Sequence, residues 1–122
     1  MDNIIYSYTR QEAVEDGVLV MADDQLCKEA GFRIPVALTA SVQAICEAFD
    51  GKDGQSYKGR LWDTLFVAMN NFKRVLRKKG EEEARLVAFT VGYWDGKKTA
   101  VEKLWIVFNE HEGFTIMKPE DY

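Results

Sequence analysis

Apolar residues recur every three or four positions over residues 60–79, a period that predicts one long amphipathic helix. Gly80 follows the last periodic position and predicts the end of this helix. The apolar stripe is broad. The side chains that we expect to pack on a sheet are Trp62, Leu65, Phe66, Met69 and Phe72.

Short elements precede the long helix. Thr9, with Glu12 three positions later, matches a capping box and predicts a helix that ends by Gly17. The β-branched run at residues 18–21 predicts a strand, and residues 23–30 predict a second short helix.

A further strand and helix complete the first half. Residues 32–38 alternate, and Pro35 restricts this segment to a sheet edge or to the start of a strand. Thr39 predicts the N-cap of the next helix, and residues 50–59 are glycine-rich and predict a loop.

The last third of the chain changes to a strand pattern. Residues 85–94 and 99–108 predict two strands around Asp95-Gly96, a dipeptide typical of hairpin turns, and residues 114–117 predict a third. Residues 118–122 read as a polar tail. The prediction is an α+β fold: short helices and strands, then a long helix packed on an antiparallel C-terminal β-meander.

Composition places all 122 residues, 47% of them hydrophobic, in a single domain that spans residues 1–122. The formal net charge of −4 disfavours general nucleic-acid binding, which usually needs a basic domain. Neither a signal peptide nor a membrane-spanning stretch is evident, and the two cysteines, Cys27 and Cys46, are expected to be reduced. We therefore expect a cytoplasmic protein without membrane contact.

Motifs that would support catalysis are missing from the sequence. The single histidine, His111, cannot complete a zinc site with two cysteines, and residues 50–61 lack the acidic twelfth position of a calcium loop. The chain has neither a phosphate-binding glycine loop nor a nucleophile motif. We expect no metal, no cofactor and no catalytic residue, so that an enzyme is the less favoured class.

A basic cluster lies at the end of the long helix and consists of Lys73, Arg74, Arg77, Lys78 and Lys79. One interpretation is contact with nucleic acid or with an acidic partner. The other is that these cations stabilise the helix C-terminus and pair with Glu81, Glu82 and Glu83. The sequence favours this second, structural interpretation.

Five blocks, residues 4–10, 13–20, 29–39, 59–65 and 115–121, resemble a family of small uncharacterised proteins carried by phages, plasmids and other mobile elements, a domain of unknown function. The chain departs from the family pattern at Met21-Ala22 and in a shorter linker to the meander. The resemblance implies a single domain with an accessory role and transfers no catalytic residue.

Polar residues inside these blocks are the candidates for a binding surface, and each also has a structural interpretation. They are Tyr6, Tyr8, Arg10, Asp16, Arg33, Arg60 and Asp63. The leading hypothesis is an accessory protein that binds a host or element protein, with an anti-defence role as one version. A nucleic-acid-associated factor that uses the basic cluster is the first alternative, and a small enzyme is the second.

Overall fold

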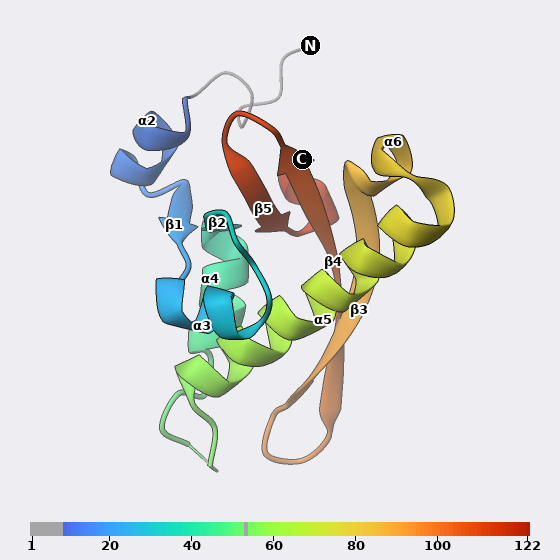
Figure 1. The fold of residues 1–122 in the computed structure, drawn as a ribbon. Helices are drawn as coiled ribbons and strands as arrows, with labels where there is room; N and C mark the ends of the chain where they lie inside the picture. The colour runs from blue at the N-terminus through green and yellow to red at the C-terminus, as the bar shows by residue number, and fades with distance from the viewer. Residues whose placement is uncertain (1–8, 53) are drawn as a thin grey trace.

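A five-stranded mixed sheet organises the structure, a computed structural model that describes residues 9–52 and 54–122 (Figure 1). The strands are β1 (Leu19–Met21), β2 (Val36–Thr39), β3 (Leu86–Trp94), β4 (Thr99–Asn109) and β5 (Gly113–Met117). In space they run in the order β1-β2-β5-β4-β3. The pairs β3–β4, β4–β5 and β1–β2 are antiparallel, whereas β2 and β5 pair parallel.

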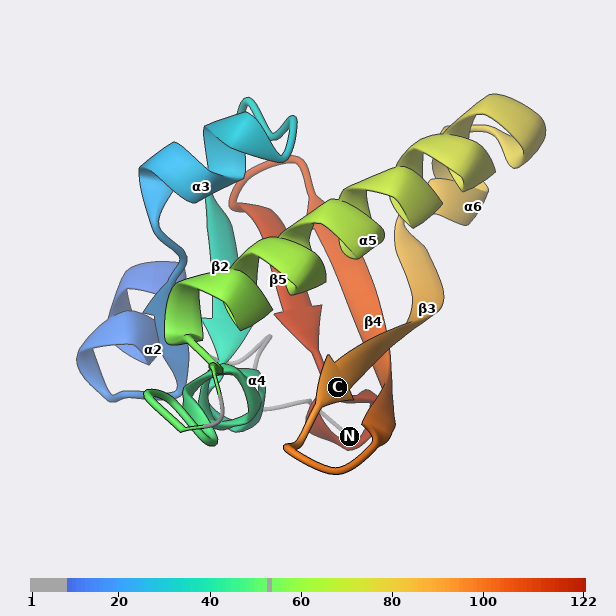
Figure 2. The ribbon, with the colours of Figure 1, turned by 90° about the horizontal axis from the view of Figure 1, so that it is seen from below.

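The helices cover both faces of this sheet unequally. They are α2 (Arg10–Glu15), α3 (Asp24–Glu29), α4 (Ala40–Glu47), α5 (Tyr57–Lys79), α6 (Glu81–Ala84) and the 3₁₀ helix η1 (Pro119–Asp121). The longest, α5, crosses one face diagonally, and its C-terminal end projects with α6 past β3 (Figure 2). α2 packs its Ala13 against Leu19 and Ala37 at the β1–β2 end of the sheet. The predicted α+β class is confirmed.

Side-chain caps explain where the helices begin. Thr9 and Glu12 form the predicted capping box on α2, and the Asp23 carboxylate caps α3 by accepting from the Leu26 amide at 3.0 Å. The Ser56 hydroxyl accepts from the Gly59 amide, so α5 begins at Tyr57, three residues before the predicted start. Gly80 ends α5 as predicted.

The β3–β4 hairpin closes through a turn built on Asp95. Its carboxylate accepts hydrogen bonds from the amides of Lys97 and Lys98, both at 2.9 Å, and these bonds lower the pKa of Asp95. Gly96 has φ +97°, a conformation that glycine adopts without steric cost. The predicted hairpin around Asp95-Gly96 is confirmed.

Strand β2 lies inside the sheet, which corrects one of the two predicted places for Pro35. β2 pairs with β1 on one side and β5 on the other, so the edge position is wrong, and Pro35 immediately precedes the strand. The Phe114 amide donates to the Pro35 carbonyl oxygen at 3.1 Å. A Cβ at Gly113 would lie 2.5 Å from that oxygen, so only glycine fits there.

The predicted polar tail is wrong, because the C-terminal residues fold back onto the start of α4. Asp121 in η1 accepts hydrogen bonds from the hydroxyls of Thr39, at 2.8 Å, and Ser41. Thr39 occupies the N-cap position of α4 as predicted, but its side chain caps no helix amide. Its hydroxyl instead joins α4 to the C-terminal segment.

The main core lies between α5 and the sheet. Leu61, Leu65 and Ala68 are completely buried there. Phe66 is 45% exposed, which contradicts its predicted place on the sheet. One residue on from Leu65 the helix has turned by about 100°, so Phe66 points outward and stacks on Trp62, with ring centroids 5.3 Å apart.

Alanine substitutions at the neighbouring residues Leu65 and Phe66 should distinguish the buried face of α5 from its exposed face. Leu65→Ala is expected to lower the free energy of unfolding by about 2–5 kcal/mol, because it opens a cavity in the core. Phe66→Ala should cost less than about 1 kcal/mol, because its side chain keeps much of its exposure in the fold. Urea unfolding of both variants measures this, and equal losses would contradict the orientation of the helix.

Candidate functional site

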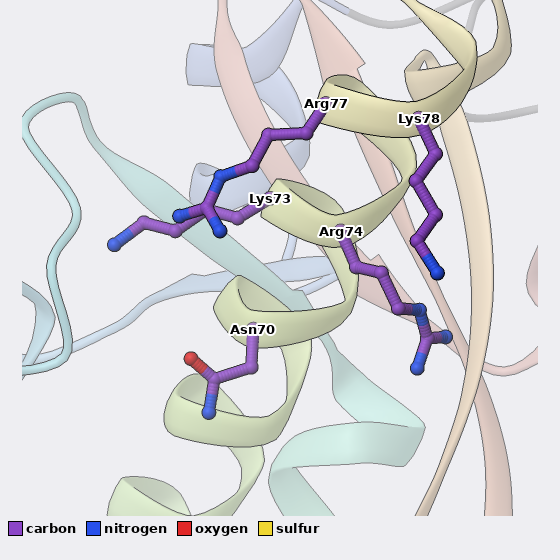
Figure 3. A pocket seen from close by; sticks show the side chains of 5 residues that line it. All are labelled: Asn70, Lys73, Arg74, Arg77 and Lys78. Atoms are coloured by element: carbon purple, nitrogen blue, oxygen red, sulfur yellow. The ribbon is translucent and has the colours of Figure 1, made fainter.

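Asn70 and the four cations on the next two turns of α5 line a shallow hollow on the outward face of the helix (Figure 3). Lys73 and Arg77 extend to one side of the helix, and Arg74 and Lys78 extend to the other. All four side chains are exposed. We call these five residues the basic face: Asn70, Lys73, Arg74, Arg77 and Lys78.

The cations of the basic face have no acidic partner in the part of the chain that the structure describes. Lys28 and Asp24 form an ion pair at 3.0 Å, but neither these cations nor Lys79 form one with Glu81, Glu82 or Glu83. The predicted pairing of the cluster with these glutamates is therefore wrong. The charge of the basic face therefore remains available to another molecule.

Charge is distributed unevenly over the molecule. α5 carries seven Lys and Arg residues against one Asp, a net +6, so the rest of the chain carries −10 for a total of −4. The small net charge of the chain is therefore the sum of a cationic helix and a strongly acidic remainder. A partner of opposite charge would be attracted to α5 and repelled elsewhere.

Arg74 connects the basic face with the edge of the sheet. Its guanidinium donates to Asn71 Oδ1 at 2.6 Å, while Asn71 Nδ2 donates to the Val67 carbonyl oxygen at 2.8 Å. Asn71 thereby holds Arg74 toward β3, where Arg74 lines a second hollow with Ala88, Phe89 and Thr90. This hollow cannot be predicted from the sequence, because only the fold brings β3 beside Arg74; the one local signal is Asn71, three residues before Arg74 on the helix.

Arg60, a predicted site residue, is buried and joins three elements. It is 6% exposed, and its guanidinium donates to the carbonyl oxygens of Ile45, at 2.9 Å, and Trp94, at 2.6 Å. The rings of Phe49 and Tyr93 lie 5.4 Å and 5.1 Å from the guanidinium carbon. These contacts fix the end of α4 and the end of β3 to α5, so they favour the structural interpretation of Arg60.

A buried hydrogen-bonded chain lies next to Arg60. The Thr64 hydroxyl donates to the Arg60 carbonyl oxygen at 2.8 Å and contacts both the Tyr93 hydroxyl and Cys46 Sγ. Burial raises the pKa of Tyr93 and of Cys46, and it raises that of Cys27 to about 11. Both thiols are free, buried and protonated at neutral pH, which is unsuited to nucleophilic chemistry.

Arg10, the described member of the N-terminal candidates, is bound to β5. Its guanidinium donates to the Phe114 carbonyl oxygen at 2.7 Å and to the Thr115 hydroxyl at 3.3 Å, and its amide donates to Glu112 at 2.8 Å. This half-buried arrangement attaches the start of α2 to the sheet. A partner contact for Arg10 stays a prediction, and Tyr6 and Tyr8 lie outside the described residues.

The remaining candidates are exposed and scattered. Asp16 is the C-cap residue of α2, and Arg33 lies between α3 and β2. Asp63 lies on the outward face of α5, where partial desolvation raises the pKa of its carboxyl. The structure does not bring these residues together with Arg10 or Arg60 into one site. Trp94, the last residue of β3 before the hairpin turn, is 46% exposed.

Within residues 9–52 and 54–122, no group of three or more His, Cys, Asp or Glu side chains could hold a metal ion. No helix in the same ranges is both long and apolar enough to cross a bilayer.

No protein-family model matches the chain, and no match was found among curated proteins or among solved structures. The resemblance to a family of mobile-element proteins therefore stays a prediction.

Loss of the Arg60 guanidinium should destabilise the fold strongly. Arg60→Ala leaves two carbonyl oxygens without their charged donor and is expected to lower the free energy of unfolding by about 2–4 kcal/mol. Lys58→Ala, on an exposed position of the same helix turn, should change it by less than about 0.5 kcal/mol. Chemical unfolding followed by tryptophan fluorescence compares the two, and a stable Arg60→Ala protein would remove Arg60 from the structural account.

Proposed function

We propose that this protein is a non-catalytic accessory protein of a phage or other mobile element, and that it acts in the cytoplasm by binding a partner protein through the basic face. The observation that supports the proposal is the set of four exposed cations without an ion pair in the described part of the chain. Their hollow lies on the longest helix, whose orientation the core fixes. Inhibition of a host defence protein is one version of this role.

An aromatic pair, the exposed Phe66 and the half-buried Trp62, extends the same surface. Trp62 and Phe66 stack one turn apart on α5, N-terminal to the basic face. Trp and Arg are enriched among residues that dominate binding energy at protein interfaces, and an exposed aromatic ring adds apolar area to a cationic surface. Aromatic rings beside cations favour a partner with acidic and apolar side chains in close proximity.

A protein partner fits the charge distribution better than nucleic acid, which is the alternative. Residues 73–79 rise by only about 9 Å along the helix axis, which matches about three nucleotides of a strand. Glu81, Glu82 and Glu83 follow at once, and the rest of the chain is net negative. A longer phosphate backbone would meet this acidic surface, whereas a compact acidic patch on a protein need not.

Charge reversal tests the proposal. The double variant Lys73→Glu with Arg77→Glu should lose a specific partner from affinity capture in a lysate of the host cell, because both cations extend from the proposed binding surface (Figure 3). The matched control reverses Lys97 and Lys98, two exposed cations in the hairpin turn, and should keep that partner. Capture is quantified by mass spectrometry at several salt concentrations, with nuclease-treated lysate in parallel.

The outcomes separate the hypotheses. Loss of one protein in the Lys73/Arg77 variant only, unchanged by nuclease, supports the proposal. Loss that nuclease treatment reproduces, with a steep salt dependence, supports nucleic-acid contact instead. Equal capture by all three proteins would contradict a role of the basic face.

A further inference from the structure

The outer edge of β3 has the properties of a docking site for an added strand. β3 ends the sheet in the described part of the chain, and its nine residues, Leu86–Trp94, contain neither a charge nor a proline. Exposed edges of this length are usually protected by charges, prolines or bulges, because their free backbone groups pair with other chains. Within β3 itself no such protection is present.

The hydrogen-bond pattern shows which backbone groups are free. The Phe108 amide donates to the Arg85 carbonyl oxygen, and the Asp95 amide donates to the Lys98 carbonyl oxygen, so odd-numbered residues of β3 bond to β4. The amides and carbonyls of the residues between them point away from β4. These residues are Leu86, Ala88, Thr90, Gly92 and Trp94. The Trp94 carbonyl oxygen accepts from Arg60 at 2.6 Å, and none of the backbone groups of the other four has a hydrogen bond within the described ranges.

Cations of α5 lie above this edge. α5 extends past β3 (Figure 2), and Figure 3 shows Arg74 and Lys78 on the side of the helix opposite to Lys73 and Arg77. Arg74 lines both the hollow of the basic face and the hollow of about 450 Å³ beside Ala88 and Thr90. A strand added to β3 would therefore bring side chains of one of its faces close to the Arg74 guanidinium, which forms no ion pair with residues 9–52 or 54–122.

We propose that β3 accepts an extended acidic segment of the partner protein as a sixth strand, with its carboxylates facing Arg74 and Lys78. This inference rests on the proposed function and specifies the partner segment: acidic side chains alternate with apolar ones. The acidic positions face α5, and the apolar positions continue the opposite face of β3, where Leu86 is 36% exposed. Backbone pairing supplies affinity, and the alternation supplies specificity.

Repulsion between like charges disfavours a second copy of this chain as the occupant of the same edge. Two copies paired antiparallel along β3 would bring both Arg74 side chains to one seam, together with both Lys78 side chains. Like charges at an interface disfavour association. An acidic segment removes this repulsion, whereas a second copy doubles it.

A nine-residue peptide of alternating valine and glutamate, acetylated and amidated, is the probe. Two further versions carry N-methyl groups on the amides of either the valines or the glutamates, so that only one edge of the peptide can donate in each. Strand addition predicts that one version loses binding at least tenfold, and that the other binds like the parent. Titration of the full chain, followed by NMR, also predicts shifted amide signals at Ala88, Thr90 and Gly92.

Protein variants test the cation. Arg74→Gln should weaken peptide binding about tenfold, whereas Lys58→Gln, an exposed cation on the first turn of the same helix, should leave it unchanged. Asn71→Leu removes the group that positions Arg74 and should weaken binding in the same direction. Thermal unfolding of each variant verifies that the fold is intact.

Several results would overturn the inference. They are equal effects of the two N-methylated peptides, no binding of the parent peptide, or sedimentation of the free protein as a dimer that Thr90→Pro dissociates. Binding of an oligonucleotide with the same Arg74 dependence, in the absence of peptide binding, would assign the edge to nucleic acid. If the peptide does not bind but the Lys73/Arg77 variant still loses its protein partner in the affinity capture, the proposed function stands and only strand addition to β3 is excluded.

Discussion

Burial of one face of α5 against the sheet is the constraint on which the other features depend. Leu61, Leu65 and Ala68 have no exposed surface, so the helix cannot rotate without opening the core. This fixed orientation turns Lys73 and Arg77 to solvent and places Arg74 over β3. The proposed binding surface is thus a consequence of how the core is packed.

Arg60 fixes the same helix at its other end. Its guanidinium binds the carbonyl oxygens of Ile45 and Trp94, which belong to α4 and to the end of β3. A buried charge is tolerated only where hydrogen bonds replace its hydration, and Arg60 meets this condition with ring contacts from Phe49 and Tyr93. The segment of α5 from Arg60 to Arg74 therefore fixes the position of β3.

Local signals predicted most elements, because caps, periodicity and turn residues act within a few positions. The parallel pairing of Val36 with Phe114 could not be read this way, since it joins strands that are distant in the sequence. The hydrogen bond from the Thr39 hydroxyl to Asp121 also joins residues that are distant in the sequence, so local signals do not predict it. The cation cluster is evident from its positions in the sequence. Its lack of ion pairs with Glu81, Glu82 and Glu83, and the position of Arg74 beside β3, depend on tertiary structure.

Hydrogen exchange of the β3 amides in the free protein, resolved by NMR, tests the central claim that this edge is open beneath α5. The account predicts that the amides of Ala88, Thr90 and Gly92 exchange rapidly, because they point away from β4, and that those of Phe89, Val91 and Tyr93 are strongly protected. Equal protection of both sets would mean that the edge is already paired, and would contradict the account.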